Sequence, residues 1–299
     1  MSSPGLPAHP VRTRGVLVLL ATFLLSAPLD AESDPPSIVT LDWTQAETLV
    51  ALGIAPLGVA QIAAYHDWVG EPRLPESVVD LGLRSQPNLE LLASLSPDHI
   101  LISPMFANLS PRLARIAPVS NLALYMPQGD TWQQIHQLTR EIGALVDRDG
   151  EAEALIETTE NRLEELQDRL PDDPAPLLMV QFMDARHVRV FGDNGLYQAV
   201  LERLGLTNAW TGTTNPWGFS LVAIERLAGI EARLVVIEPY PAGVPAELRE
   251  SGLWQHQASV RDESLITLPP VWSFGALPSA RRFAEQLVAA LGEATHVDD

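Results

Sequence analysis

The sequence of 299 residues contains no cysteine and has half as many basic residues as acidic ones. The lack of cysteine excludes disulfides, thiolate chemistry, cysteine-ligated zinc and a lipid attached to an N-terminal cysteine. With 19 basic and 38 acidic residues the net charge is −19, so no nucleic acid is expected as a partner, because little is available to neutralise phosphates. Hydrophobic residues make up 46% of the chain, which is ordinary for a globular protein, and its length favours two domains.

The N-terminal region lacks an apolar run long enough to cross a membrane comfortably. Residues 15–26 (GVLVLLATFLLS) are apolar, with Arg12 and Arg14 before them and small residues after them. A membrane-spanning helix needs about 20 apolar residues, so this shorter run indicates a signal peptide over residues 1–31, cleaved after Ala31 or after Ala27. An uncleaved anchor is the alternative. We expect a soluble protein of the periplasm without a lipid anchor.

Motifs for catalysis are missing as well. The sequence has no GxSxG, no phosphate-binding Walker loop and no GxGxxG, and its seven histidines show neither HxH nor HExxH spacing. Asp172 and Asp173 are adjacent but stand in a proline-rich break, a poor context for paired catalytic carboxylates. We therefore expect a protein that is not an enzyme and holds no resident metal or cofactor.

Short apolar segments alternate with helical patterns along the chain. Residues 38–41 and 99–102 have the pattern of strands, the second of them covered on both faces. Thr44 is the predicted cap of a helix that runs through Leu52, and Asn88 is the predicted start of another helix. This alternation predicts an α/β fold.

The longest helical pattern lies near the middle of the chain, at residues 149–170. It ends in the proline-rich segment PDDPAP. We expect this helix to link an N-terminal α/β lobe at residues 37–148 to a C-terminal α/β lobe at residues 174–299. If it is instead an ordinary surface helix, the boundary between the lobes stays in the same place.

The two halves of the sequence resemble each other. LELLASLSPDHILIS at residues 89–103 aligns with IERLAGIEARLVVIE at residues 224–238, at a constant offset of 135 residues, and Glu90 meets Glu225. A second pair, LGI and LGL, ends the first helix of each half. These matches predict two duplicated Rossmann-like lobes, with a ligand cleft between them.

The candidate cleft residues are one arginine and a set of aromatic side chains. Arg84 stands on a glycine-containing turn before a helix, a place where α/β proteins often bind ligands, although a solvated surface charge is the simpler explanation of a single arginine. Large aromatic residues are expected in loops of both halves, namely Trp43, Trp68, Trp217, Trp272, Phe106, Phe219 and Phe274. Packing at loop edges would explain any one of them, but together they suit an apolar cleft with a single orienting cation.

Several segments resemble the periplasmic ferric-hydroxamate (ferrichrome-type) siderophore-binding proteins. They are ALGIAPLGVA, YHDWVGEPRLPESVVDLGLRSQPNLELL, RIAP, RHVRVFG, NAWTGTTNPWG and LPPVWSFGA, and the similarity extends over about residues 37–292. The resemblance implies a class III solute-binding protein of an ABC importer, with two α/β lobes, one long linking helix and a shallow aromatic cleft. It implies an Fe(III)-hydroxamate complex as ligand and an inner-membrane ABC permease as partner, for a protein expected to be a monomer.

The resemblance also implies roles for single residues. Arg84 matches the arginine that hydrogen-bonds hydroxamate oxygens, and the matched walls of the cleft are Trp68, Trp217, Trp272 and Leu196, with Trp43 as a weaker match. No protein residue is expected to touch the iron, because the siderophore already fills its coordination shell with oxygens. Within binding proteins, a carrier of another iron chelate, haem or cobalamin is the alternative. An exported α/β enzyme that uses Arg84 as an anion clamp is the alternative from another class.

The sequence departs from the family at two cleft positions. Phe106 and Phe274 stand where the family has aromatic hydroxyls. Losing one phenol removes a hydrogen bond of about 0.5–1.5 kcal/mol net. We therefore expect Phe106 to narrow or shift the range of hydroxamate ligands relative to relatives that have tyrosine there, which leaves another hydroxamate than ferrichrome open as the ligand.

The resemblance also implies a docking role for Glu90 and Glu225. They match the family's glutamates, one on each lobe, that dock onto arginines of the membrane permease. Helix stabilisation by acidic residues near the N-terminus is the simpler explanation of both, and Glu231 is a rival position in the second lobe.

Overall fold

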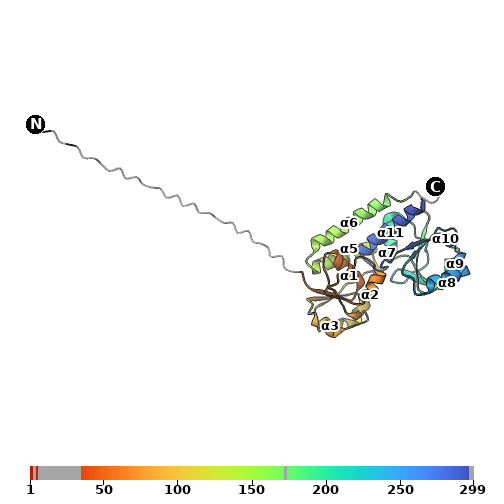
Figure 1. Ribbon diagram of the computed structural model, residues 1–299, viewed down its shortest axis with the longest axis horizontal. Coiled ribbons are helices and arrows are strands. Elements are labelled where there is room, and N and C mark those ends of the chain that lie inside the picture. Colours follow the sequence, from red (N-terminus) through yellow and green to blue (C-terminus); the bar gives the residue numbers. More distant parts are fainter. Residues whose placement is uncertain (3–4, 6–34, 172–173, 296–299) are drawn as a thin grey trace. The chain divides into compact units, whose positions relative to one another are not determined.

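The computed structural model describes residues 1–2, 5, 35–171 and 174–295 (Figure 1). Contacts divide the chain into Met1–Asp34 and a compact unit, Pro35–Asp299. The predicted signal peptide falls almost entirely outside the described residues. Within the described part, no helix has the length and apolarity that crossing a membrane requires.

The first half of the compact unit is built on a five-stranded sheet in the order β3-β2-β1-β6-β7, with every neighbouring pair parallel. Its strands are β1 (Ile38–Thr40), β2 (Gly58–Val59), β3 (Val79–Asp80), β6 (His99–Ile102) and β7 (Val119–Asn121). The connecting helices are α1 (Trp43–Ala51), α2 (Ile62–Trp68), α3 (Leu89–Ser94), a 3-10 turn η1 (Pro104–Leu109) and α4 (Ser110–Leu113). Parallel strands need such crossovers, and helices on both faces explain why β1 is buried throughout.

The second half has another five-stranded sheet, in the order β10-β9-β8-β11-β12. Its strands are β8 (Leu177–Phe182), β9 (His187–Phe191), β10 (Phe219–Ala223), β11 (Arg233–Ile237) and β12 (Ile266–Leu268). The helical elements are α7 (Leu196–Leu204), the 3-10 turn η2 (Ile224–Leu227), α8 (Val244–Glu250), α9 (Gly252–Gln255) and α10 (Ala258–Arg261). The strands β8, β11 and β12 are parallel, whereas β9 is antiparallel to both of its neighbours because a short turn joins it to β8.

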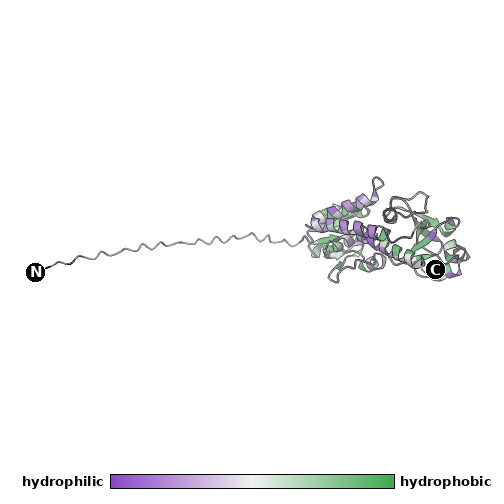
Figure 2. Ribbon diagram, turned by 90° about the horizontal axis from the view of Figure 1, so that it is seen from above, coloured by the Kyte–Doolittle hydropathy of each residue, from purple (hydrophilic) through white to green (hydrophobic). Residues whose placement is uncertain are grey.

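Three long helices connect the two sheets. They are α5 (Thr131–Leu145), α6 (Asp149–Gln167) and α11 (Leu277–Thr295), and α6 packs against both of the others. One hydrophobic cluster includes Ile38 of β1, Leu163 of α6 and Val235 of β11, so the core continues from one sheet to the other. Figure 2 shows hydrophilic residues along the outer sides of the long helices, which leaves their apolar sides for this core. The helix predicted over residues 149–170 ends at Gln167, three residues early.

The start of α1 differs from the prediction. Asp42, not Thr44, is the cap: its backbone is extended, and its carboxylate accepts hydrogen bonds from the amides of Thr44 at 2.9 Å and Gln45 at 3.4 Å. Trp43, expected in a loop, is therefore the first residue of the helix. The predicted start of α3 is confirmed, because Asn88 accepts a hydrogen bond from the amide of Leu91 at 3.0 Å.

Candidate functional site

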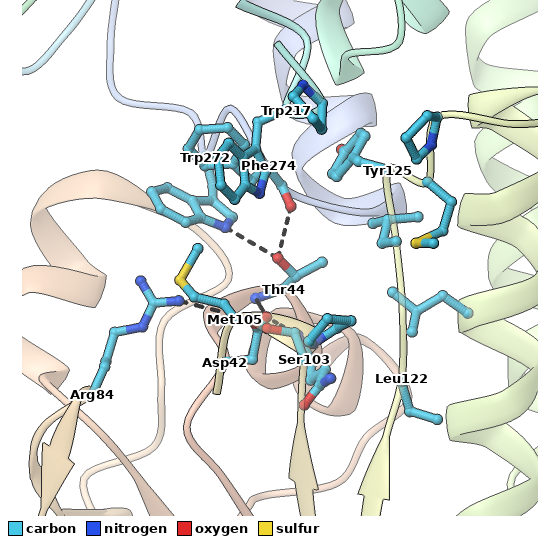
Figure 3. A pocket seen from close by; sticks show the side chains of 17 residues that line it. Asp42, Thr44, Arg84, Ser103, Met105, Leu122, Tyr125, Trp217, Trp272 and Phe274 are labelled. Atoms are coloured by element: carbon cyan, nitrogen blue, oxygen red, sulfur yellow. Dashed lines mark hydrogen bonds and ion pairs between the residues drawn. The ribbon is translucent and has the colours of Figure 1, made fainter. Parts of the chain in front are cut away.

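A cavity of about 290 Å³ opens between the ends of the two sheets (Figure 3). Both halves of the sequence contribute to its lining. The lining residues are Asp42, Thr44, Gln45, Arg84, Ser103, Pro104, Met105, Leu122, Leu124, Tyr125, Met126, Pro127, Leu138, Pro216, Trp217, Trp272 and Phe274. The volume is near the lower end of the range for ligand pockets, about 300–1,000 Å³, so part of a larger ligand would remain outside the cavity.

Arg84 reaches this cavity from a tight hairpin formed by β4 (Gly82–Leu83) and β5 (Gln86–Pro87). Gly82, the first residue of β4, has a positive φ of 80°, a conformation that glycine adopts without steric cost. The guanidinium carbon lies 4.3 Å from the ring centre of Trp43, 5.0 Å from that of Phe106 and 5.7 Å from that of Trp272. These rings hold the cation in a fixed place at the cavity wall.

Asp42 compensates the charge of Arg84. Its Oδ2 lies 3.8 Å from Nη2 of Arg84, whose Nε donates to the carbonyl oxygen of Leu41 at 3.1 Å. Burial lowers the pKa of Arg84 and the Asp42 carboxylate opposes that shift. Arg84 and Asp42 are the two charged side chains in the lining, so the lining as a whole is electrically neutral.

An aromatic wall faces Arg84 from the second half of the chain (Figure 3). Trp272 packs edge-on against Phe274 with ring centres 5.1 Å apart, and it also contacts Trp43 at 5.0 Å. Trp217 lies in the loop before β10 and is 48% exposed. The wall therefore has two parts. Trp272 and Phe274 can contact the part of a ligand that lies inside the cavity, and the exposed Trp217 can contact the part at the mouth.

Other predicted site residues lie away from the cavity lining. Trp43 and Phe106 are buried beside the guanidinium of Arg84, without lining the cavity themselves. Leu196 begins α7 and is fully buried in the core. Trp68 ends α2 and lines a second, open cavity of about 540 Å³, together with Arg73, Arg282 and other residues.

The two predicted docking residues are on the surface. Glu90 is exposed in α3, and Glu225 is exposed in the 3-10 turn η2. Each element precedes the strand at the fourth position of its sheet, β6 or β11.

Sequence reasoning missed the sulfur-containing side chains at the mouth. Met105 follows β6 in η1 and is 56% exposed, and Met126 follows β7 and is 49% exposed. Methionine is flexible and polarisable, so it adapts to irregular apolar shapes. Their positions after the parallel strands β6 and β7 could have identified them from the sequence, because ligands bind at that edge of a sheet.

Hydrogen bonds join the two sides of the cavity at its base. The Thr44 hydroxyl donates to the carbonyl oxygen of Phe274 at 2.7 Å and accepts from Nε1 of Trp272 at 3.1 Å. The Tyr125 hydroxyl donates to the carbonyl oxygen of Gly275. Figure 3 shows the bonds made by Thr44. Three segments distant in sequence are thereby fixed to one another.

Glu47 continues this connection below the cavity. Its buried carboxylate accepts from the amide of Ala276 at 2.6 Å and from the hydroxyl of Ser279, at the start of α11. Burial raises its pKa from an ordinary 4.5 to about 8, and the hydrogen bonds from Ser279 and Ala276 only partly oppose that shift.

The described residues contain no group of three or more His, Asp or Glu side chains arranged to hold a metal ion. The cavity instead offers a charge-assisted donor, hydroxyls and apolar surface. These groups suit the binding of an organic molecule that has oxygen acceptors.

Comparisons with known proteins agree with this geometry. The iron(3+)-hydroxamate-binding protein FhuD of Escherichia coli is 37% identical over 264 residues, covering 88% of this chain and 89% of the relative. The periplasmic Fe(3+) dicitrate-binding protein FecB of Escherichia coli is 31% identical, covering 79% of this chain and 78% of the relative.

Among solved structures, the siderophore-binding protein FhuD of Vibrio cholerae with bound Fe3+-Desferal superposes with a TM-score of 0.81. It is 29% identical, and the match covers 86% of this chain and 97% of that one. The sequence profile of the periplasmic binding protein family matches residues 38–271. The chain therefore belongs to the periplasmic binding protein family.

Proposed function

We propose that this protein is the periplasmic component of an ABC importer for Fe(III)-hydroxamate siderophores, which it delivers to an inner-membrane permease. The observation that carries the proposal is the Arg84 guanidinium, held against three aromatic rings at the wall of an apolar cavity. Arginine presents several N–H donors in a fixed plane, which suits the oxygen-rich face of a ferric hydroxamate. The aromatic wall suits the organic backbone of the siderophore.

The charge of the lining supports hydroxamates over other iron chelates. Three hydroxamates cancel the charge of Fe(III), whereas three catecholates leave a strongly negative complex. Arg84 is already paired with Asp42, so the lining has no excess positive charge for such an anion. The names of the relatives agree, because one binds iron-hydroxamate and a solved neighbour binds Fe3+-Desferal.

The iron belongs to the cargo. Its oxygen ligands come from the siderophore, so the protein needs no resident cofactor and contributes hydrogen bonds and surface. Export through a cleaved signal peptide, a monomeric state and docking through Glu90 and Glu225 complete the proposal. Their exposure on the elements that precede β6 and β11 supports the docking role.

Titration of tryptophan fluorescence with ferrioxamine E, a neutral cyclic trishydroxamate, tests the function. The wild type is expected to bind it, and Arg84→Ala to bind it between tenfold and about a hundredfold more weakly, because a charge-assisted hydrogen bond contributes about 1.5–3 kcal/mol.

Arg186→Ala is the matched control for that titration, because it removes an exposed arginine outside the lining. Equal affinity of the wild type, Arg84→Ala and Arg186→Ala, or no binding of any hydroxamate by the wild type, would contradict the proposal.

A further inference from the structure

A second arginine lies behind the aromatic wall. Arg189 is in the middle of β9, and its guanidinium carbon is 4.8 Å from the ring centre of Phe219 and 5.8 Å from that of Phe274. Phe274 lines the cavity. Arg189 is therefore one aromatic ring away from the ligand cleft, on the wall opposite Arg84.

Arg189 differs from Arg84 in having no acidic partner. Its side-chain hydrogen bond runs from Nη1 to Oε1 of Gln181 at 3.4 Å. None of the ion pairs within 4.0 Å among the described residues includes Arg189. A guanidinium has five N–H donors, so several remain available here. Burial lowers the pKa of Arg189, and the Tyr197 phenol rather than a carboxylate opposes that shift.

Most of the described arginines outside ion pairs are exposed, as Arg112 and Arg186 are, whereas Arg189 is half-buried. Surface arginines such as Arg140 and Arg162 pair with Glu153 and Glu285 at 2.6–2.9 Å. With a net charge of −19, carboxylates are abundant, yet the described part of the chain places none beside Arg189. The half-buried guanidinium thus has aromatic rings and the Gln181 amide as neighbours, and no carboxylate among the described residues.

The face of the sheet that carries Arg189 opens to solvent. Leu221 of β10 is directly opposite Arg189 in the antiparallel ladder, so the two side chains lie on the same face, and Leu221 is 62% exposed. Trp217, at the mouth of the cavity, precedes the same strand. The long arginine side chain can therefore meet a group that extends from the cleft over this face.

We propose that Arg189 binds a carboxylate at the periphery of the siderophore, while Arg84 contacts the hydroxamates around the iron. The preferred ligand is then a hydroxamate complex that carries an additional acidic group. This inference rests on the proposed function. Its alternative is that Arg189 serves only to pack against Phe219 and Phe274.

A charge series on one iron centre tests the inference. Ferrioxamine B carries a free ammonium group at one end; its N-acetyl derivative is neutral there, and its N-succinyl derivative ends in a carboxylate. All three keep the same iron coordination. Affinities are measured by tryptophan fluorescence for the wild type, Arg189→Gln and Arg186→Gln.

Arg186→Gln is the matched control, because it removes the same charge from an exposed position next to β9. We expect the wild type to bind the succinyl complex on the order of tenfold more tightly than the acetyl complex. Arg189→Gln is expected to lose that preference and Arg186→Gln to keep it. Both variants lose one positive charge, so any change in the repulsion between the acidic protein and the anionic ligand is the same in both.

Two results would overturn the inference and leave the proposed function intact. One is a wild type that binds the acetyl and succinyl complexes equally; the other is an Arg189→Gln variant that loses the same factor for all three ligands, as a packing role predicts. Failure of the wild type to bind any of the three would instead contradict the proposed function. If Arg189→Gln does not fold, Arg189→Lys decides, because it keeps the charge and must keep the succinyl preference.

Discussion

The strands β6 and β11 have the same place in their sheets, each fourth in order and each between two parallel neighbours. The strands at the second position differ. The first sheet has β2, which follows β1 through α1 and runs parallel to it, whereas the second has β9, which follows β8 through a short turn and runs antiparallel. A crossover helix brings its own N-terminus to the ligand edge of a sheet, and a hairpin does not.

This difference determines what each side offers a ligand. The first side presents the start of α1, so Asp42 is available to pair with Arg84. The second side presents β9, whose Arg189 has aromatic neighbours and no described acid. Two five-stranded sheets can therefore carry one compensated and one uncompensated cation, and the connections between strands decide which is which.

Removing Glu47 should have the largest effect, because it breaks the connection between the two sides. Glu47→Ala leaves the buried amide of Ala276 and the hydroxyl of Ser279 without an acceptor, at about 1–3 kcal/mol each. Urea unfolding should show this loss. Glu47→Gln is the control, since its amide can serve both partners, and equal loss in both variants would contradict the explanation.

The titration of Glu47 gives a second, smaller effect. Its pKa is raised to about 8 in the folded state, so the folded protein holds this proton more tightly than the unfolded chain. Its contribution to stability is complete below about pH 4.5 and is lost as the pH rises through about 8. The difference in unfolding free energy between the wild type and Glu47→Gln should change across this window. A constant difference from pH 5 to pH 8.5 would show that Glu47 titrates normally.

The two tryptophans of the aromatic wall should separate stability from affinity. Trp272→Phe loses the hydrogen bond to Thr44, worth about 1 kcal/mol, and should lower the melting temperature. Trp217→Ala, at an exposed position, should leave the melting temperature unchanged and weaken ferrioxamine E binding several-fold. Scanning calorimetry and fluorescence titration of both variants check this, and the opposite pattern would refute it.

Docking on the permease compares the two lobes directly. Glu90→Ala with Glu225→Ala should leave siderophore affinity unchanged and reduce transport in reconstituted vesicles several-fold, because rim charges act mainly on orientation and association rate. Glu231→Ala is the control at the rival position. Normal transport by the double variant would leave both residues with a helix-stabilising role alone.

The smallest effect is expected for Phe106→Tyr. The ring is buried beside Arg84, so a phenol there gains a hydroxyl next to the guanidinium that we propose contacts the ligand oxygens. Affinity for ferrioxamine E should rise a few-fold, equivalent to about 0.5–1.5 kcal/mol. Phe106→Leu keeps an apolar side chain without the hydroxyl and serves as the control. An affinity that does not increase with tyrosine would remove this explanation of the ligand range.

The sequence predicted what depends on local pattern. Strands covered on both faces leave continuous apolar runs, which located β1 and β6, and a side-chain cap is a local signal, which located Asn88. Arg84 was identified from a local pattern too, because it stands on a glycine-containing turn before α3.

Local pattern could not predict the features that depend on three-dimensional pairing. Asp42 and Thr44 are both plausible caps, and only the backbone conformation selects one. From the sequence alone Glu47 is expected on the surface, because its burial depends on α11, which is distant in sequence. The position of Arg189 beside the cleft requires the register of β9 with β8 and β10, which no single segment encodes.

The hydrogen bonds of Thr44, Tyr125 and Glu47 have a consequence for how empty and loaded copies of the protein compete for the permease. They join the two lobes through the protein's own atoms, with no contribution from a ligand. An empty protein should then present nearly the same outline as a loaded one. Empty copies should compete with loaded ones for the permease, so raising the amount of binding protein above that of its siderophore should slow import instead of accelerating it.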